Sequence, residues 1–308
     1  MMHRTVGGSG LRVSVVGLGT GSWGRETDGD EAAAQLMGFF EAGGTLVDTS
    51  PEYAGGAAQR VLAELLDDVI PRSELVLSGS AGIAEDLDGA HRIDCSRRTL
   101  LRQLDESLDE LGTDHLDVWS IAAWDPATPV DEIGATLDAA VSSGRVRYAG
   151  ARGLSGWQLA TLAGAVRITA GQVEYSLLER RAEYEYAPAA AHHRVGMFAT
   201  APLAGGVLTG KYHAGVPADS RGADEHRAAE VRGYLDERTS RVVDAVLTAA
   251  DGLGTSPLGV ALAWARDRPG VAATIVGARD SAQLTGVLAA ADLELPRAIG
   301  AALDDVSA

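Results

Sequence analysis

The sequence predicts an α/β protein whose fold is a closed (β/α)8 barrel. Short runs rich in β-branched residues alternate with longer stretches that carry apolar residues at helical spacing. This alternation favours parallel strands, because each crossover between them is a helix. Eight such runs occur in 308 residues with no recognisable linker, so one barrel domain over residues 1–308 accounts for the chain.

The eight strand candidates follow one another along the whole chain. They are Val13–Leu18, Thr45–Asp48, Leu75–Ser78, Leu116–Ile121, Val146–Ala149, Ala170–Val173, Val195–Ala199 and Thr274–Gly277. The clearest helix candidate is Ser96–Leu111, with leucines along one face and Ser96 as its N-cap, and Asp30–Ala42 is another. The long polar segment Leu203–Arg238 breaks the rhythm, and we expect it to overhang the C-terminal face of the barrel.

A doubly wound open sheet is the alternative fold. Its usual mark is a glycine-rich phosphate-binding turn between the first strand and its helix. Gly17, Gly19 and Gly21 resemble that turn only superficially, because the helix pattern starts near Asp30. The barrel is therefore the favoured fold.

Composition limits the function classes. Acidic residues outnumber basic ones 43 to 26, and the net charge of −17 disfavours nucleic acid as a partner. No apolar run is long enough for a membrane helix, and the N-terminus lacks the apolar region of a signal peptide, so we expect a soluble, cytoplasmic protein. Cys95 is the only cysteine, and no histidines have metal-ligand spacing with a third ligand nearby, so we expect no metal.

Seven motifs in order resemble the aldo-keto reductases along almost the whole chain. The segment 7–20 resembles the opening hairpin and first strand of that family, and the segment 42–53 resembles the part that carries its catalytic Asp and Tyr. The motifs LDELGTDHLDVW, GRVRYAG, QVEYSLLER, PLAGGVLTGKY and IVGARDSAQL follow. The resemblance implies a (β/α)8 barrel capped by an N-terminal β-hairpin. It also implies hydride transfer between NADPH and a carbonyl.

Half of the catalytic tetrad implied by the resemblance is absent. Asp48 and Tyr53 match, but Ser80 stands where the family has its lysine and Ala122 where it has its histidine. A tyrosine hydroxyl is a weak acid at neutral pH unless a neighbouring cation adjusts its pKa. Lys211, the only lysine in the chain, matches a different family lysine in the TGKY motif and does not replace the missing one.

Most of the implied NADPH contacts differ as well. Arg152 and Gly153 replace the Ser-Asn pair that holds the carboxamide, and Thr200 replaces the aromatic residue that stacks on the nicotinamide. Asp280 stands where a hydroxyl residue is expected near the 2′-phosphate, and Gly286 and Val287 replace the Glu-Asn pair near the adenine. Gln172, Arg279 and Gln283 remain as vestiges of the site. We therefore expect no cofactor, with NADPH as the alternative.

The surviving polar residues define the candidate catalytic site. Asp48 and Tyr53 are the candidate catalytic residues, Asp48 as a general acid or base or as a carboxylate held by amides or an arginine. Arg152 is its possible cation partner, a clamp for a substrate carboxylate, or a solvent-facing residue. Glu52 is a second acid or base or a solvated carboxylate.

The candidate substrate-binding residues are Trp23, Glu52, Ser80, Ala122, Trp124, Arg152, Gln172 and Thr200. Trp23 and Trp124 are expected to form an apolar wall, with core packing as the alternative. Ser80 and Ala122 are smaller than the residues they replace, so we expect a widened pocket and a bulky small-molecule substrate.

Three functions follow from these observations. The retained acid pair beside an altered cofactor site favours a cofactor-independent lyase, isomerase or cyclase that catalyses a non-redox step in bacterial specialised biosynthesis. The first alternative is an NADPH-dependent oxidoreductase of the aldo-keto reductase family. The second is a catalytically inactive barrel that acts as a binding or regulatory subunit.

Overall fold

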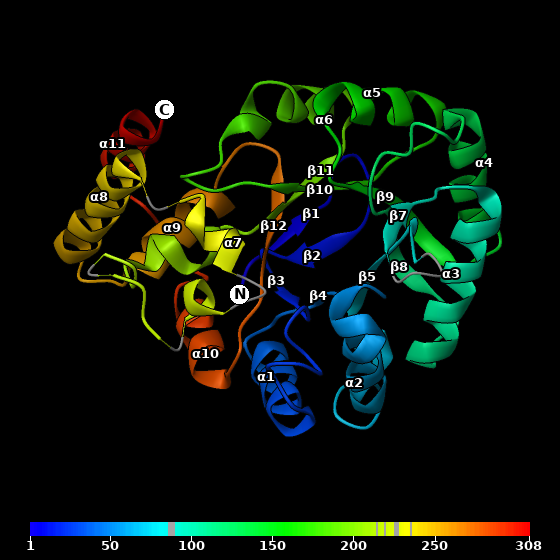
Figure 1. Ribbon diagram of the computed structural model, residues 1–308, viewed down its shortest axis with the longest axis horizontal. Coiled ribbons are helices and arrows are strands. Elements are labelled where there is room, and N and C mark those ends of the chain that lie inside the picture. The colour runs from blue at the N-terminus through cyan, green and yellow to red at the C-terminus, as the bar shows by residue number, and fades with distance from the viewer. Residues whose placement is uncertain (86–89, 214, 219, 225–227, 235) are drawn as a thin grey trace.

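Eight parallel strands form a closed barrel in the computed structural model of the chain, which describes residues 1–308 except 86–89, 214, 219, 225–227 and 235. Figure 1 shows the helices as an outer layer around the strands. The barrel strands are β3 (Val16–Gly19), β4 (Leu46–Asp48), β5 (Val76–Ala81), β8 (Leu116–Ile121), β9 (Val146–Arg152), β10 (Ala170–Glu174), β11 (Gly196–Thr200) and β12 (Val271–Val276). The predicted (β/α)8 barrel is confirmed.

The helices of the outer layer connect or flank these strands. They are α1 (Gly29–Glu41), α2 (Ala57–Leu65), α3 (Arg97–Leu111), α4 (Val130–Ser142), α5 (Gly156–Ala165), α6 (Tyr186–His193), α7 (Ala228–Arg232), α8 (Glu237–Leu253), α9 (Pro257–Arg266), α10 (Ser281–Ala289) and α11 (Arg297–Ser307). No single helix in the described part is long and apolar enough to cross a membrane. The pair α8 and α9 meets the length and composition criterion together, but it bends by 103°.

Helix α3 illustrates how the sequence fixes its own ends. Ser96 Oγ accepts a hydrogen bond from the Thr99 amide at 3.4 Å, as expected of an N-cap. Gly112 ends the helix in the left-handed region at φ 62°, where a glycine has no side-chain clash. Leu100 and Leu104 are fully buried on the barrel side, so the leucine stripe predicted from the sequence faces the core.

The first predicted strand is two strands in the structure. Val13 belongs to β2 (Arg12–Ser14), which pairs antiparallel with β1 (His3–Thr5), and the barrel strand β3 starts only at Val16. The sequence does not show this break, because the run of β-branched residues continues across it. The alternation of side chains along a strand does not show where the chain leaves one sheet for another. The hairpin residues Val6 and Val13 pack in one cluster with Leu46 and Phe198. The predicted N-terminal hairpin cap is present.

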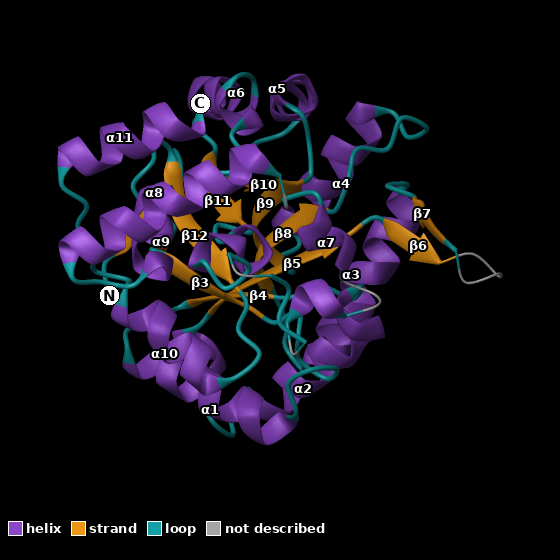
Figure 2. Cartoon of the chain, turned by 60° about the vertical axis from the view of Figure 1, so that its left-hand side comes forward, coloured by secondary structure: helices purple, strands orange, loops and turns teal. Residues whose placement is uncertain are grey.

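Two further segments lie beyond the C-terminal ends of strands. The hairpin β6 (Ile83–Glu85) and β7 (His91–Ile93) follows β5 and projects from the body in Figure 2. The segment predicted as a long loop, Leu203–Arg238, instead carries the 3₁₀ helices Ala204–Thr209 and Arg221–Ala223, the helix α7 and the first residues of α8. Positions 214, 219, 225–227 and 235 of that prediction lie outside the described residues.

Candidate active site

Asp48 is the centre of a buried polar cluster at the C-terminal end of the barrel. It is the last residue of β4, and its side chain is almost fully buried. Its Oδ1 accepts hydrogen bonds from Ser78 Oγ at 2.9 Å, from Gln172 Nε2 at 2.6 Å and from Arg152 Nη2. Its Oδ2 accepts one from the Tyr53 hydroxyl at 3.1 Å. Four donors from four parts of the fold therefore satisfy one buried carboxylate.

The barrel topology explains why these side chains meet. Ser78 lies beside Asp48 because β4 and β5 pair in register, and Gln172 lies beside Arg152 because β9 and β10 do. Strands β5 and β8 separate β4 from β9, so the long Arg152 side chain spans the barrel mouth to reach Asp48. A serine at position 152 could not cover that distance.

Arg152 is the cation beside Asp48 and Tyr53. Of the three sequence interpretations of this residue, the geometry selects the ion pair with Asp48, since only 8% of Arg152 is exposed. Burial lowers the pKa of Arg152, but the charge of Asp48, with smaller contributions from Tyr53 and Glu52, outweighs burial and raises it. The guanidinium stays charged, and it supplies from β9 the positive charge that Ser80 on β5 cannot.

Tyr53 is a poor acid in this arrangement. The Asp48 charge and then burial raise the pKa of its hydroxyl well above the ordinary value, and Arg152 offsets only part of the rise. The residue begins the 3₁₀ helix Tyr53–Gly56, and its amide donates to the Ser50 carbonyl at 3.1 Å in a tight turn after β4. This turn brings the hydroxyl back to the carboxylate of Asp48.

Glu52 and Ser80 belong to a second hydrogen-bonded group of side chains, which Ser50 joins. Ser50 Oγ donates to Glu52 Oε2, and it lies 2.9 Å from Ser80 Oγ at the end of β5. The other oxygen of the carboxyl, Glu52 Oε1, is buried and has no hydrogen-bond partner. Burial raises the pKa of Glu52, against smaller lowering effects from a backbone hydrogen bond, Arg152 and His91. Glu52 is therefore not the solvated carboxylate of the alternative interpretation.

The two tryptophans occupy different environments. Trp124, in the loop after β8, is partly buried, and its ring centroid lies 5.2 Å from that of Trp157 in an edge-to-face contact. Trp157, in the first turn of α5, is 58% exposed. Trp23 is fully buried and its indole N–H donates to Gln35 Oε1 at 3.1 Å, which gives it a packing role in place of the expected place in the pocket wall.

The remaining predicted residues lie at or just after the C-terminal ends of barrel strands. Ala122 follows β8, and its amide donates to the Ala81 carbonyl at 2.7 Å. Thr200 ends β11, half-buried, and its carbonyl accepts from the Tyr175 amide at 3.0 Å. Gln172, expected to be a vestige of the cofactor site, donates to Asp48.

Sequence reasoning missed Ser50, Ser78 and Trp157. Ser78 could have been found, because it lies two residues before Ser80 and strand side chains alternate between faces. Trp157 follows a helix-start signal, in which the Ser155 side chain caps the backbone of Gln158 and the Gln158 side chain caps that of Ser155. The role of Ser50 depends on the turn conformation after β4, which has no clear sequence signal.

Two basic side chains, Lys211 and Arg279, lie in the loops that the family resemblance assigns to the phosphates of a dinucleotide. In the turn after β11, Gly206 has a φ of +90°, and a Cβ there would lie 2.8 Å from Cε and Nζ of Lys211. Arg279 and Gln283 lie at the start of α10, where the Arg279 amide donates to Gln283 Oε1 at 3.2 Å. At the other end, Arg152 Nε and Thr49 Oγ1 are buried polar atoms without a partner, as an amide ligand would require.

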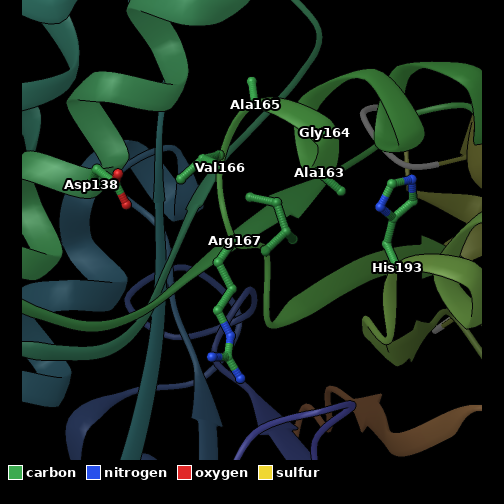
Figure 3. Close-up of a pocket in the computed structure, with 8 residues that line it drawn as sticks. Asp138, Ala163, Gly164, Ala165, Val166, Arg167 and His193 are labelled. Carbon is green, nitrogen blue, oxygen red and sulfur yellow. The ribbon is translucent and has the colours of Figure 1, made fainter.

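A hollow of about 460 Å³ lies elsewhere on the barrel, between α4, α5 and α6 (Figure 3). Asp138 and His193 lie on opposite sides of it in Figure 3. Its residues Arg167 and Ile168 precede β10, so it opens at the N-terminal end of the strands, away from Asp48. Among the described residues, no group of three or more His, Cys, Asp or Glu side chains could hold a metal ion.

Comparison with known proteins identifies the family. A sequence model described as "Aldo/keto reductase family" matches residues 15–308. The "L-glyceraldehyde 3-phosphate reductase" of Escherichia coli (strain K12) is 31% identical, with 92% of this chain and 86% of that protein covered. The "Uncharacterized oxidoreductase YrpG" of Bacillus subtilis (strain 168) is 30% identical, with coverage of 99% and 96%. A "Probable voltage-gated potassium channel subunit beta" of Oryza sativa subsp. japonica is 32% identical, with coverage of 95% and 92%.

These matches correct two sequence predictions. The prediction of a non-redox lyase, isomerase or cyclase was wrong, because the match extends over nearly the whole chain and the relatives include named reductases and oxidoreductases. The prediction that no cofactor is used was wrong for the same reason, since the family transfers hydride with NADPH. The missing motif residues were over-weighted, because the pairing of Arg152 with Asp48 was only one of three interpretations of Arg152, and it is the one that the structure shows. This chain has the fold of an enzyme and belongs to the aldo/keto reductase family.

Proposed function

We propose that this protein is an NADPH-dependent oxidoreductase that reduces the carbonyl group of a small molecule. The observation that carries the proposal is the ion pair between Asp48 and Arg152 beside the Tyr53 hydroxyl. It supplies a carboxylate, a cation and a hydroxyl in contact at the barrel mouth, although the family lysine is absent from the sequence.

The residues of the cluster have distinct roles in this proposal. Bound NADPH would supply the hydride, held by Lys211 and Arg279 at its phosphates and by Arg152 Nε or Thr49 Oγ1 at its carboxamide. When substrate is bound, Tyr53 turns its hydroxyl from Asp48 to the substrate oxygen and donates its proton there as that oxygen gains negative charge. Arg152 stabilises the negative charge that remains on the Tyr53 oxygen, and Asp48 holds the guanidinium in place.

Cofactor binding and turnover test the proposal together. Calorimetric titration with NADPH, and with NADH for comparison, should give micromolar binding. Loss of reduced-nicotinamide absorbance with a panel of aldehydes and ketones should then identify substrates. Absence of binding at millimolar cofactor would contradict the proposal. Binding without turnover on any carbonyl would instead favour the inactive, regulatory barrel.

Arg152 offers a sharper variant test. Arg152→Lys keeps a positive charge on a shorter side chain, and Arg152→Met removes the charge at similar length. We expect Arg152→Met to lower kcat by at least about tenfold, as loss of an electrostatic contact in a closed site does. Arg102→Met on the exposed face of α3 is the matched control, and its rate should not change.

We also propose a class of substrate and a cellular compartment for the protein. A bulky small molecule is proposed because Ser80 and Ala122 carry small side chains and Trp157 exposes an aromatic ring next to Trp124. The net charge of −17 supports the proposal that nucleic acid and anionic membranes are not partners. The single buried cysteine, Cys95, supports a reducing, cytoplasmic setting.

A further inference from the structure

The loops after β11 and β12 are the part of this barrel best suited to phosphate groups. Phosphate sites in (β/α)8 barrels often use the loops after the seventh and eighth strands together with the N-terminus of a nearby short helix. Strands β11 and β12 are the seventh and eighth barrel strands along the chain, and α10 begins at Ser281, soon after β12. Lys211 follows β11 and Arg279 follows β12, so each loop carries a cation.

The N-terminus of α10 is already occupied by carboxylates of the protein itself. A helix N-terminus attracts a phosphate because its first amides have no partner within the helix and its dipole is positive there. At α10, Asp280 Oδ1 accepts a hydrogen bond from the Gln283 amide at 2.8 Å. Glu31 Oε1 accepts hydrogen bonds from both the amide and the hydroxyl of Ser281. Two of the first three amides of this helix therefore have a carboxylate partner.

Glu31 reaches α10 because the start of α1 is fixed against the loop before that helix. Helices α1 and α10 lie side by side in both views of the chain (Figures 1 and 2). Ser22 Oγ donates to the Ala278 carbonyl at 2.9 Å, and Thr27 Oγ1 donates to the Arg279 carbonyl at 3.0 Å. These bonds join the loop before α1 to the loop before α10, so the position of the Glu31 carboxylate is part of the fold.

The charges at this end of α10 bear on the choice between NADPH and NADH. The two cofactors differ only in the phosphate on the adenosine 2′-oxygen, and a phosphate monoester carries about 1.5 to 2 negative charges at neutral pH. Asp280 stands at the position that the family resemblance assigns to a hydroxyl residue near that phosphate. We propose that this protein binds NADH at least as tightly as NADPH, because the carboxylates of Glu31 and Asp280 offset the attraction of Arg279 for the 2′-phosphate. The inference rests on the proposed function and concerns which reduced nicotinamide supplies the hydride.

Direct binding measurements on the wild-type protein test the inference without any turnover. Calorimetric titrations with NADH and with NADPH, in the same buffer, give the two dissociation constants. We expect the Kd of NADH to be equal to that of NADPH or lower. NADPH binding that is more than about threefold tighter than NADH binding would overturn the inference and leave the proposed oxidoreductase in place.

Charge-removing variants test whether the two carboxylates are the cause. Asp280→Asn keeps a side chain that can cap the helix, and Glu31→Gln keeps an acceptor for Ser281. One charge at an exposed helix terminus changes binding by about two- to fivefold, so the double variant should raise the ratio of NADPH affinity to NADH affinity at least about threefold. Glu41→Gln, at the exposed far end of α1, is the matched control and should leave the ratio unchanged. A smaller rise in the double variant would overturn the inference.

The outcomes separate the inference from the proposed function. If both cofactors bind but no carbonyl is turned over, the proposed function fails, and the ratio of the two affinities still decides the inference. If neither cofactor binds at millimolar concentration, the proposed function and the inference fall together. Either single variant keeps the test valid should the double variant fold poorly, because each should raise the ratio about twofold.

Discussion

Removal of the Arg152 charge should destabilise the whole barrel through Asp48. The carboxylate is 1% exposed, and in Arg152→Met it keeps the donors Ser78, Gln172 and Tyr53 but loses the cation that contacts it. Loss of one partner of a buried ion pair costs about 3–5 kcal/mol, because the other charge is left uncompensated. The three remaining neutral donors keep the expected loss at the lower end, about 3 kcal/mol.

Urea unfolding followed by tryptophan fluorescence measures this loss. A decrease of about 3 kcal/mol lowers the ratio of folded to unfolded protein by more than about a hundredfold. The double variant Asp48→Asn with Arg152→Met removes the uncompensated charge as well, and it should recover at least half of the loss.

The double variant also shows what would refute the reasoning. A loss below about 1 kcal/mol in Arg152→Met would mean that the pair carries no more than a surface ion pair does. A double variant no more stable than Arg152→Met would mean that the loss comes from packing of the arginine stem and not from the charge of Asp48.

Three further predictions concern single side chains. Tyr53→Phe should lower kcat at least about tenfold in the carbonyl assay while urea unfolding shows a loss of only about 1 kcal/mol for one hydrogen bond; an unchanged rate would exclude Tyr53 as a donor. Trp23→Phe should destabilise the fold by about 1–3 kcal/mol, through the lost indole bond to Gln35 and lost bulk, but leave KM unchanged, and a raised KM would return Trp23 to the pocket wall. Burial, with the charges of Asp125 and Asp94, raises the pKa of Cys95 to about 12, so alkylation at pH 8 should be negligible in the folded protein and complete in urea when followed by mass spectrometry; rapid labelling of the folded protein would contradict its burial.

The fold could be predicted from periodicity because the barrel repeats one local pattern. Strand β8 was predicted at its observed bounds, since Leu116–Ile121 is a short run rich in apolar and aromatic residues after the turn-forming Gly112–Asp114. Strand β12 was predicted at Thr274 but begins at Val271, because alanines, which are weak strand formers, stand at 272 and 273. The break between β2 and β3 depends on tertiary pairing, which no local pattern records.

The site was predicted as a set of residues, and its central contact, between Asp48 and Arg152, was left open among three interpretations of Arg152. Asp48 and Tyr53 follow one strand closely, so their proximity is readable from the chain. The pairing of Asp48 with Arg152 joins residues 104 positions apart on strands that are not neighbours. Only the closed barrel brings them together, so the sequence could not select this contact over its alternatives, and the absence of the lysine was over-interpreted as the absence of the chemistry.

The ion pair across the barrel mouth also constrains how such a sequence can arise. A lysine at Ser80 alone would place a second cation against Asp48 and break the contact with Ser50, whereas loss of Arg152 alone leaves the carboxylate uncompensated. A protein that changes only one of the two positions, 80 or 152, is therefore less stable than a protein with either complete arrangement. Positions 80 and 152 are therefore expected to change as a pair during descent, and a substitution tolerated in one lineage would be harmful in the other.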